Sequence, residues 1–231
     1  MEDKLQNLQR IIGYHFFNEG LLKCALTHSS YANERKINKV EDYERLAFLG
    51  DAVLEMVSSE FLYLSHPEMR EGQLTRLRAS MVCEPALAFC AKDISLGEYI
   101  YLGKGEEATG GRNRSSVTSD VLEAIIGAIF LDGGIENAKI FIQKFILNDL
   151  ENKTLFYDSK TLLQEEIQKK SGRILEYRLL REEGPEHDKN FVVEVLVDGK
   201  VRAVGEGHNK KLAEQDAAYK VLIEIRKGKE N

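Results

Sequence analysis

The chain has 231 residues, 43% of them hydrophobic and 30% charged, which is enough for two modest domains with their own cores. Its formal net charge of −6, with a pI near 5.5, by itself argues against a nucleic-acid-binding protein, because such domains are usually basic. The three cysteines form no CxxC pair, so neither a disulfide framework nor a cysteine zinc site is expected. No apolar run approaches the ~20 residues of a membrane span, and the polar start of the chain lacks the apolar core of a signal peptide. We therefore expect a cytoplasmic protein with no membrane association.

The first part of the chain is expected to be helical. Residues 157–231 carry 15 acidic and 15 basic side chains, so the whole acidic excess belongs to residues 1–156. In that first part, apolar residues recur at three- and four-residue intervals, and no alternating strand pattern is present. The glycine-rich, charged stretch 103–114 is expected to be a loop. The predicted helices include residues 47–57, 74–82, 121–131 and 138–150.

The last seventy residues predict a small mixed domain with the order α-β-β-β-α. Asp198-Gly199 is a two-residue hairpin signal between the second and third strands. The sequence therefore predicts an all-helical domain over 1–150, a linker over 151–157 and an α-β-β-β-α domain over 158–228. The expected elements of the last domain are helices at 159–170 and 211–225 and strands at 174–180, 191–197 and 201–204.

Carboxylates set among apolar residues are the most informative feature of the helical part. Glu44 and Asp51 are seven residues apart, on one stripe of a helix, and Asp120 and Glu123 share a face of another. If these helices face each other, like charges converge, which costs free energy unless a hard cation neutralises them. Oxygen ligands without histidine or cysteine suit Mg²⁺, with Mn²⁺ as a substitute. Such a cation can activate a water and stabilise charge on a phosphoryl group.

A simpler interpretation exists for each acid taken singly: it caps a helix or pairs with a distant arginine such as Arg45, Arg76 or Arg78. Gly50 and Gly127 favour the convergent arrangement. Glycine inside a helix costs about 1 kcal/mol relative to alanine, and close approach of the two helices is the expected compensation.

The segment Glu44-Arg-Leu-Ala-Phe-Leu-Gly-Asp-Ala-Val-Leu-Glu55 closely resembles the signature of bacterial ribonuclease III. The resemblance covers nearly the whole chain. It implies an endonuclease domain that forms a homodimer, with one metal site per subunit, each cutting one strand of double-stranded RNA. The implied reaction is Mg²⁺-dependent hydrolysis of ribosomal RNA precursors and structured messenger RNA, leaving 5′-phosphate and 3′-hydroxyl ends with short 3′ overhangs. Further matching motifs, in family order, are Thr27–Asn33, Glu71–Arg78, Leu102–Glu106 and Ser119–Ala124.

The resemblance also assigns roles to the acids. It makes Asp51, Asp120 and Glu123 metal ligands, with Asp51 and Glu123 catalytic, and it assigns Glu44 to RNA contact. The family pattern has a glutamate at position 47, where this chain has Ala47, which offers no ligand oxygen. We therefore expect weaker Mg²⁺ binding and slower cleavage than glutamate at that position would give. Two explanations stay open: a variant made to bind RNA without cutting it, or a natural enzyme in which water or a neighbouring acid fills the position.

The last domain resembles a double-stranded-RNA-binding domain. Such domains read A-form RNA by shape, 2′-hydroxyls and phosphates over about 16 base pairs. By resemblance, the first helix, with Gln164 and Gln168, and the loop with His187 enter successive minor grooves, while Lys210 and Lys211 grip phosphates. The lysines lie at a helix N-terminus, where backbone amides also favour phosphate. The matching motifs are Lys160–Glu165, Gly184–Phe191 and Asn209–Ala218.

Simpler interpretations accompany these assignments: a solvated helix face for the lysines and glutamines, and a turn residue for His187. His28 is given a structural role by the resemblance. The stretch 103–114 is either a phosphate cradle, with Arg112 and Arg114 touching RNA, or a simple loop. Three functions are thus weighed: an endoribonuclease, a catalytically impaired double-stranded-RNA-binding variant, and an RNA chaperone, which would also bind single strands.

Overall fold

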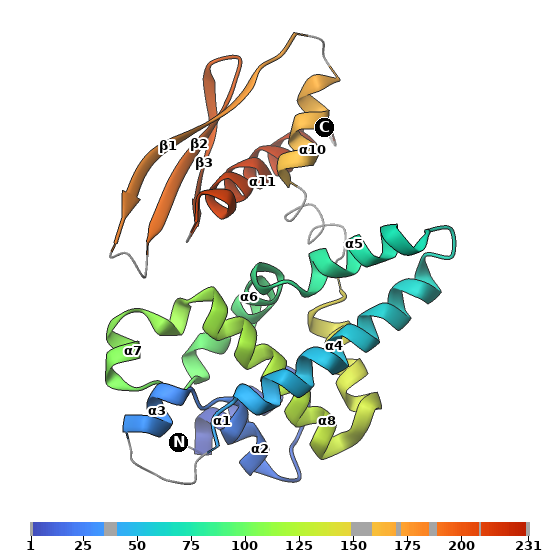
Figure 1. Cartoon of the computed structure of the whole chain (residues 1–231), viewed down its shortest axis with the longest axis vertical. Helices are drawn as coiled ribbons and strands as arrows, with labels where there is room; N and C mark the ends of the chain where they lie inside the picture. Colours follow the sequence, from blue (N-terminus) through green and yellow to red (C-terminus); the bar gives the residue numbers. More distant parts are fainter. Residues whose placement is uncertain are drawn as a thin grey trace. The chain divides into compact units, whose positions relative to one another are not determined.

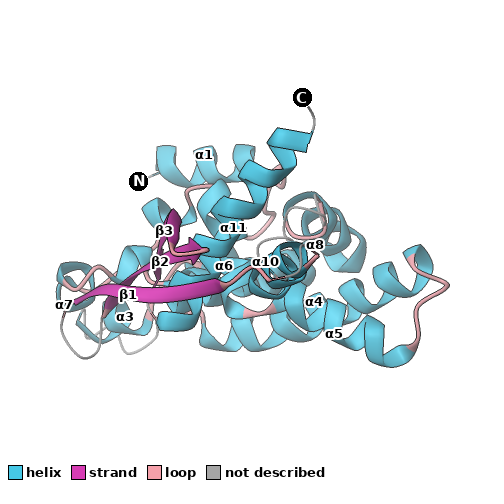
Figure 2. Ribbon diagram, turned by 90° about the horizontal axis from the view of Figure 1, so that it is seen from above, coloured by secondary structure: helices cyan, strands magenta, loops and turns pink. Residues whose placement is uncertain are grey.

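The computed structural model describes residues 2–34, 41–148, 159–169, 172–184, 189–207 and 209–229. The chain divides into two compact units, Met1–Asn148 and Asp149–Asn231 (Figure 1). In the described residues, strands longer than an isolated bridge occur only in the second unit (Figure 2). The predicted fold class, a helical domain followed by an α-β-β-β-α domain, is confirmed. No helix of the described residues is long and apolar enough to cross a membrane, and the three cysteines form no disulfide.

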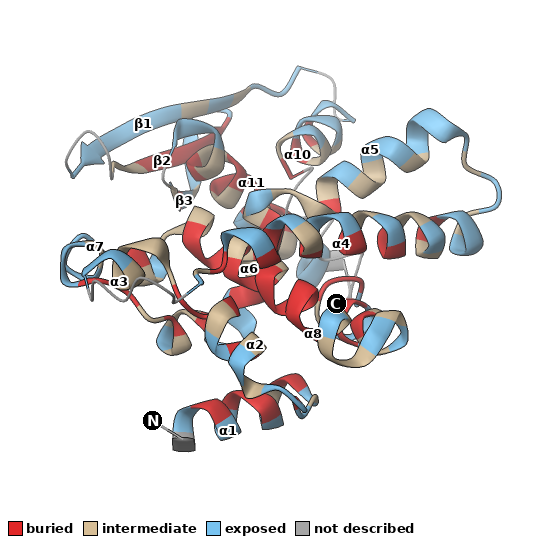
Figure 3. Ribbon diagram, turned by 60° about the horizontal axis from the view of Figure 1, so that its bottom comes forward, coloured by how far each residue is buried: buried red, intermediate tan, exposed pale blue. Residues whose placement is uncertain are grey.

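Two long helices, α4 and α8, form the centre of the first unit. Helix α8 is buried along most of its first half, because its residues are apolar on nearly every face (Figure 3). At Gly134 its backbone is non-helical (φ 78°, ψ 179°), and this kink separates the two helical stretches that the sequence predicts. The elements of this unit are α1 (Glu2–Ile12), α2 (Glu19–Ala25), α3 (Ser29–Glu34), α4 (Glu44–Ser65), α5 (Glu71–Val82), α6 (Glu84–Asp93), η1 (Leu96–Tyr99), α7 (Lys104–Ala108), η2 (Gly111–Asn113) and α8 (Ser115–Phe145).

The backbones of α4 and α8 touch at two glycines. A Cβ atom on Gly50 would lie 1.8 Å from the backbone oxygen of Glu123, and one on Gly127 would lie 2.3 Å from that of Leu46. Real Cβ atoms do not approach a backbone oxygen so closely, so a side chain at either position would push the helices apart. The predicted reason for glycine at these two positions is confirmed.

The stretch 103–114 is not a simple loop, and that expectation was wrong. It contains the short helices α7 and η2. The carboxylate of Glu34 accepts hydrogen bonds from the backbone amides of Lys104 and Gly105, at 2.8 and 3.2 Å, and so caps the first turn of α7. Because this cap comes from a residue about seventy positions earlier, the local glycine-rich composition could not reveal the helix.

The second unit is a three-stranded antiparallel sheet with two helices packed on one face. Gly205 lies against α11, since a Cβ there would come within 2.2 Å of the backbone of Ala213 and Ala217. The hairpin between β2 and β3 turns at Asp198 and Gly199, whose φ angles of 53° and 73° suit the predicted two-residue turn. The elements are α10 (Ser159–Gln168), β1 (Leu175–Glu183), β2 (Asn190–Val197), β3 (Lys200–Gly207) and α11 (Lys210–Lys229).

Replacing Gly50 with alanine is expected to destabilise the first unit by about 2–3 kcal/mol, because the new methyl group overlaps the backbone of Glu123. Gly72→Ala in α5 is the matched control: nothing lies within 4 Å of its added Cβ, and alanine favours a helix. Urea unfolding followed by circular dichroism compares the two. Equal unfolding midpoints for both variants and the parent chain would contradict the close approach of α4 and α8.

Candidate active site

Three predicted acids share one environment where α4 packs on α8. Asp51 follows Gly50 on α4, and Glu123 is the residue whose backbone the glycine approaches. Burial, and then the negative charges of Asp51 and Asp120, raise the pKa of Glu123 to about 8. The convergence of like charges that the sequence predicts is therefore present, and it costs free energy in the absence of a cation.

Asp120 lies on the same face of α8 as Glu123 and is partly buried. Burial raises its pKa, as do the negative charges of Glu84 and, to a smaller extent, Glu44, while the neighbouring His28 and Tyr43 side chains act in the opposite direction. Glu44, at the start of α4, thus lies close enough to influence this acid. Sequence reasoning did not find Glu84, because it begins α6 and no local motif links it to the other acids.

None of the ion pairs among the described residues involves Asp51, Asp120 or Glu123. In the described residues, these acids therefore do not pair with distant arginines, as the simpler interpretation had suggested. The three candidate arginines are used elsewhere: Arg45 contacts Glu41, Arg76 donates to the Gly72 carbonyl oxygen, and Arg78 pairs with Glu55 at 2.7 Å.

Ala47 lies one turn before Asp51 on α4 and is buried, with 8% of its surface exposed. Across the described ranges, no three histidine, cysteine or carboxylate side chains converge closely enough to hold one metal ion. The acids that are present fit a hard cation in kind and in charge, because they offer only oxygen atoms and have no basic partner. Position 47 adds no oxygen to this donor set, which agrees with the expected weak Mg²⁺ binding.

The arginines of the 103–114 stretch are occupied inside the first unit. Arg112 pairs with Glu107 and donates to the backbone oxygen of Gly97 at 2.6 Å, while Arg114 pairs with Glu106. These contacts fasten α7 and η2 to the rest of the unit. Neither interpretation from the sequence describes this stretch: it is not a simple loop, and both arginines are engaged in contacts within the unit rather than left open for a phosphate.

The first helix of the second unit exposes its polar face. Gln164 and Gln168 are exposed and one turn apart on α10, whereas Leu163 and Ile167 on the neighbouring face are buried in the core. Two long amide side chains therefore extend in the same direction, free to donate and accept hydrogen bonds.

Lysines gather at the start of α11. Lys210 and Lys211 are exposed in its first turn, and the side-chain oxygen of Asn209 accepts a hydrogen bond from the Leu212 amide at 2.9 Å. Nearby, Glu182 pairs with Lys189 at 2.5 Å, and both this contact and the charge of Lys210 lower its pKa. The sequence analysis did not single out Lys189. His187 lies outside the described residues.

Each of the two units matches a known protein family. Residues 18–150, more than half of the chain, match the family described as Ribonuclease-III-like. The chain belongs to the ribonuclease III family. Residues 159–225 match the double-stranded RNA binding motif.

Members of the ribonuclease III family match over almost the whole chain. The chain is 48% identical to Ribonuclease 3 of Pelotomaculum thermopropionicum over 225 residues, covering 96% of this chain and 93% of that protein. Ribonuclease 3 of Bacillus licheniformis is 46% identical over 227 residues, covering 97% and 91%. A solved nuclease domain of ribonuclease III from Campylobacter jejuni, described for flexibility in a region involved in dimer formation, has a TM-score of 0.57 and 41% identity, and covers 62% of this chain and 95% of that one.

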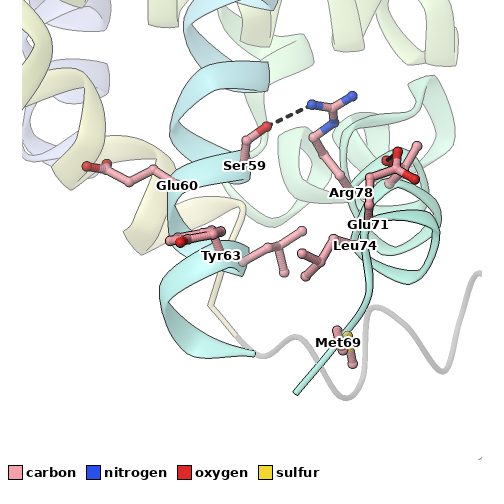
Figure 4. A pocket seen from close by; sticks show the side chains of 9 residues that line it. Ser59, Glu60, Tyr63, Met69, Glu71, Leu74 and Arg78 are labelled. Atoms are coloured by element: carbon pink, nitrogen blue, oxygen red, sulfur yellow. Dashed lines mark hydrogen bonds between the residues drawn. The ribbon is translucent and has the colours of Figure 1, made fainter. Parts of the chain in front are cut away.

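This ribonuclease III chain also has a groove between α4 and α5 that the sequence did not predict (Figure 4). It encloses about 600 Å³, and apolar side chains such as Tyr63, Met69 and Leu74 line it together with polar and charged ones. Arg78 donates a hydrogen bond to the hydroxyl of Ser59 at 2.8 Å and so braces α5 against α4. None of Asp51, Asp120 and Glu123 lines this groove, whereas the exposed Tyr63 of α4 does.

Glu123→Gln is expected to stabilise the metal-free protein at alkaline pH. The pKa of Glu123 is about 8 in the folded chain against an ordinary 4.5, so its destabilising effect is absent below pH 4.5, grows as the pH rises and is complete above pH 8. In EDTA at pH 8.5 the variant should gain ~2 kcal/mol, which is several degrees of melting temperature. The gain should shrink at pH 5.5.

The exposed residue Glu136 of the same helix provides the control, as Glu136→Gln removes a carboxylate away from the acids. Thermal melts of the three proteins at both pH values make the comparison. An unchanged or lower melting temperature of Glu123→Gln at pH 8.5 would show that the acids do not destabilise one another.

Proposed function

We propose that the chain is an Mg²⁺-dependent endoribonuclease that hydrolyses double-stranded RNA. The observation that carries this proposal is the gathering of Asp51, Asp120 and Glu123 at the contact of α4 and α8 without a basic partner. An acidic site repels a phosphodiester unless a cation is bound, so the site requires a divalent ion for this substrate. The proposed substrates are ribosomal RNA precursors and structured messenger RNA, cut to 5′-phosphate and 3′-hydroxyl ends.

In this proposal Asp51, Asp120 and Glu123 would hold the ion, for which their side chains must draw closer together than the structure places them, and Asp51 and Glu123 would contribute directly to catalysis. Bound Mg²⁺ offsets the mutual repulsion of these acids and stabilises negative charge on the phosphoryl group during an in-line displacement. Since the pKa of Glu123 is about 8 without the ion, its carboxylate holds a proton for much of the time at neutral pH. The Glu123 carboxylate would have to release that proton to become a ligand, so metal binding should strengthen as the pH rises toward 8.

The second unit supplies affinity for the duplex in this proposal. The exposed amides of Gln164 and Gln168 would contact 2′-hydroxyls and base edges in a minor groove, with His187 in the next one. Lys210 and Lys211 would contact phosphates at the start of α11. On the first unit, Glu44 is proposed to contact RNA. The domains are proposed to span 1–150 and 158–228, joined by the linker 151–157.

We further propose a cytoplasmic homodimer assembled through the nuclease domain. Phe48, Met56 and Tyr63 on α4 are 82%, 53% and 73% exposed, although apolar side chains of this size are normally buried. They lie along one side of the helix, and Tyr63 also lines the groove between α4 and α5, so a second copy of the chain could cover them. The Campylobacter jejuni nuclease domain, described for a region involved in dimer formation, supports this assembly.

A second candidate function is a catalytically impaired double-stranded-RNA binder, and Ala47 is the observation that favours it. Ala47→Glu should speed cleavage of a long perfect duplex at least tenfold in Mg²⁺, because a carboxylate there adds an oxygen one turn from Asp51. Gel assays with both proteins, in Mg²⁺ and in EDTA, measure the rates. Equal cleavage by both proteins would show that position 47 is not part of the metal site. Duplex binding without cleavage by either protein would contradict the nuclease assignment.

Lys210 and Lys211 are expected to bind the duplex through the positive charges of their side chains. The double substitution of both lysines by alanine should weaken binding and reduce the salt dependence of log K by about one per lost phosphate contact. Gln164→Ala should weaken binding with an unchanged salt slope, because it loses only uncharged contacts. Fluorescence anisotropy with a 16-base-pair duplex at several salt concentrations, in EDTA, separates the two effects. An unchanged slope in the double variant would exclude phosphate contacts by these lysines.

A further inference from the structure

The first turn of α10 is tied to α11 by two polar contacts. The hydroxyl of Ser159, which is fully buried, donates a hydrogen bond to the carbonyl oxygen of Gln215 at 2.7 Å. The ammonium group of Lys160 forms an ion pair with the carboxylate of Glu214 and lies 5.1 Å from the centroid of the Tyr177 ring. The lysine that opens the motif of α10 is therefore used between the two helices.

These contacts lie one helical turn from both sets of proposed RNA contacts. On α10, Gln164 follows Lys160 by four residues, so the two side chains share one face of the helix. On α11, Glu214 follows Lys210 by four residues and shares a face with it in the same way. The ion pair between Lys160 and Glu214 therefore connects the face that carries the glutamine to the face that carries the lysine.

The apolar core between the helices does not by itself define their relative position so closely. Leu163 and Ile167 of α10 pack in one cluster with Ala217 and Val221 of α11. Burial of apolar surface is favourable in any direction, so it tolerates small shifts of one helix along the other. A hydrogen bond and an ion pair require particular distances and angles. The two polar contacts thus fix the position of α10 along α11.

We propose that Lys160 and Glu214 are positioning residues for duplex recognition: their ion pair holds Gln164 at the distance from Lys210 that fits a minor groove and the neighbouring phosphates of A-form RNA. This inference rests on the proposed function. Double-stranded RNA is recognised by its shape, so the two sets of contacts must be correctly spaced. B-form DNA has grooves of different width and attracts such a unit mainly through its phosphate charge. The ion pair therefore contributes to the preference for RNA over DNA.

Glu214→Gln separates positioning from charge, because the two predict opposite results. Electrostatics alone predicts tighter binding of a duplex, since the substitution removes a negative charge one turn from Lys210. Loss of positioning predicts weaker binding of the RNA duplex. Glu224→Gln is the matched control, because it also removes an acid of α11 that forms an ion pair, with Arg202 at 3.3 Å, but it lies further from Lys210.

The full chain and its variants are titrated in EDTA with a 16-base-pair RNA duplex and with the DNA duplex of the same sequence, using fluorescence anisotropy. We expect Glu214→Gln to weaken RNA binding about fivefold without weakening DNA binding, which is the size expected for the loss of one partly buried ion pair. Glu224→Gln should leave the ratio of the two affinities unchanged. Adding Lys160→Met to Glu214→Gln should lower that ratio little further, because the pair is already broken.

Melting temperatures check the fold, and all titrations are made well below them. Ser159→Ala is a second variant that removes the other contact without changing any charge, and it should also lower the ratio of RNA to DNA affinity. A ratio that is unchanged in both Glu214→Gln and Ser159→Ala overturns the positioning role and leaves the proposed RNA contacts intact. If the parent chain binds both duplexes equally, the proposed recognition of double-stranded RNA fails and the inference with it.

Discussion

The backbone contact between α4 and α8 is the constraint on which the first unit depends. With only hydrogen on the α-carbons of Gly50 and Gly127, each helix can lie against the peptide groups of the other. Glu123 belongs to that contact through its own carbonyl oxygen, so its side chain leaves the helix at the seam, close to Asp51. The burial of Glu123 and its closeness to another negative charge result from this contact between the helices, and not from any property of the acids themselves. The same contact places Asp120 near the start of α4, where Tyr43 and Glu44 influence its pKa.

Much of this arrangement could be predicted from sequence because the relevant spacing is local. Acids three or seven residues apart must share a helix face, and a glycine within an apolar helix indicates a close neighbour. The hairpin at Asp198 was equally readable, because its turn depends on two adjacent residues. The acidic cluster and the fold of the second unit therefore followed from short-range rules, and family resemblance added the roles of the residues.

What the sequence could not reveal depends on contacts between distant segments. The helix α7 is capped by Glu34, and Arg112 reaches back to the Gly97 carbonyl oxygen, so the composition of the stretch 103–114 alone suggested a loop. Glu84 and Tyr43 approach Asp120 from separate elements, and neither carries a local pattern that indicates this. The groove between α4 and α5 likewise requires the angle between two helices, which no spacing of residues encodes.

The internal pairing of the arginines has a consequence for how the two units contribute to capturing RNA. Arg78, Arg112 and Arg114 already neutralise carboxylates of their own, so they leave the charge of the acidic cluster uncompensated. In the proposed function, a phosphate backbone approaching this cluster would meet an electrostatic barrier that a divalent ion lowers, whereas the lysines of α11 would attract the same backbone with or without the ion. In chelator, retention on a duplex would then report the second unit alone. The metal would thus determine not only the chemistry at the cluster but also the order in which the two units engage their common substrate.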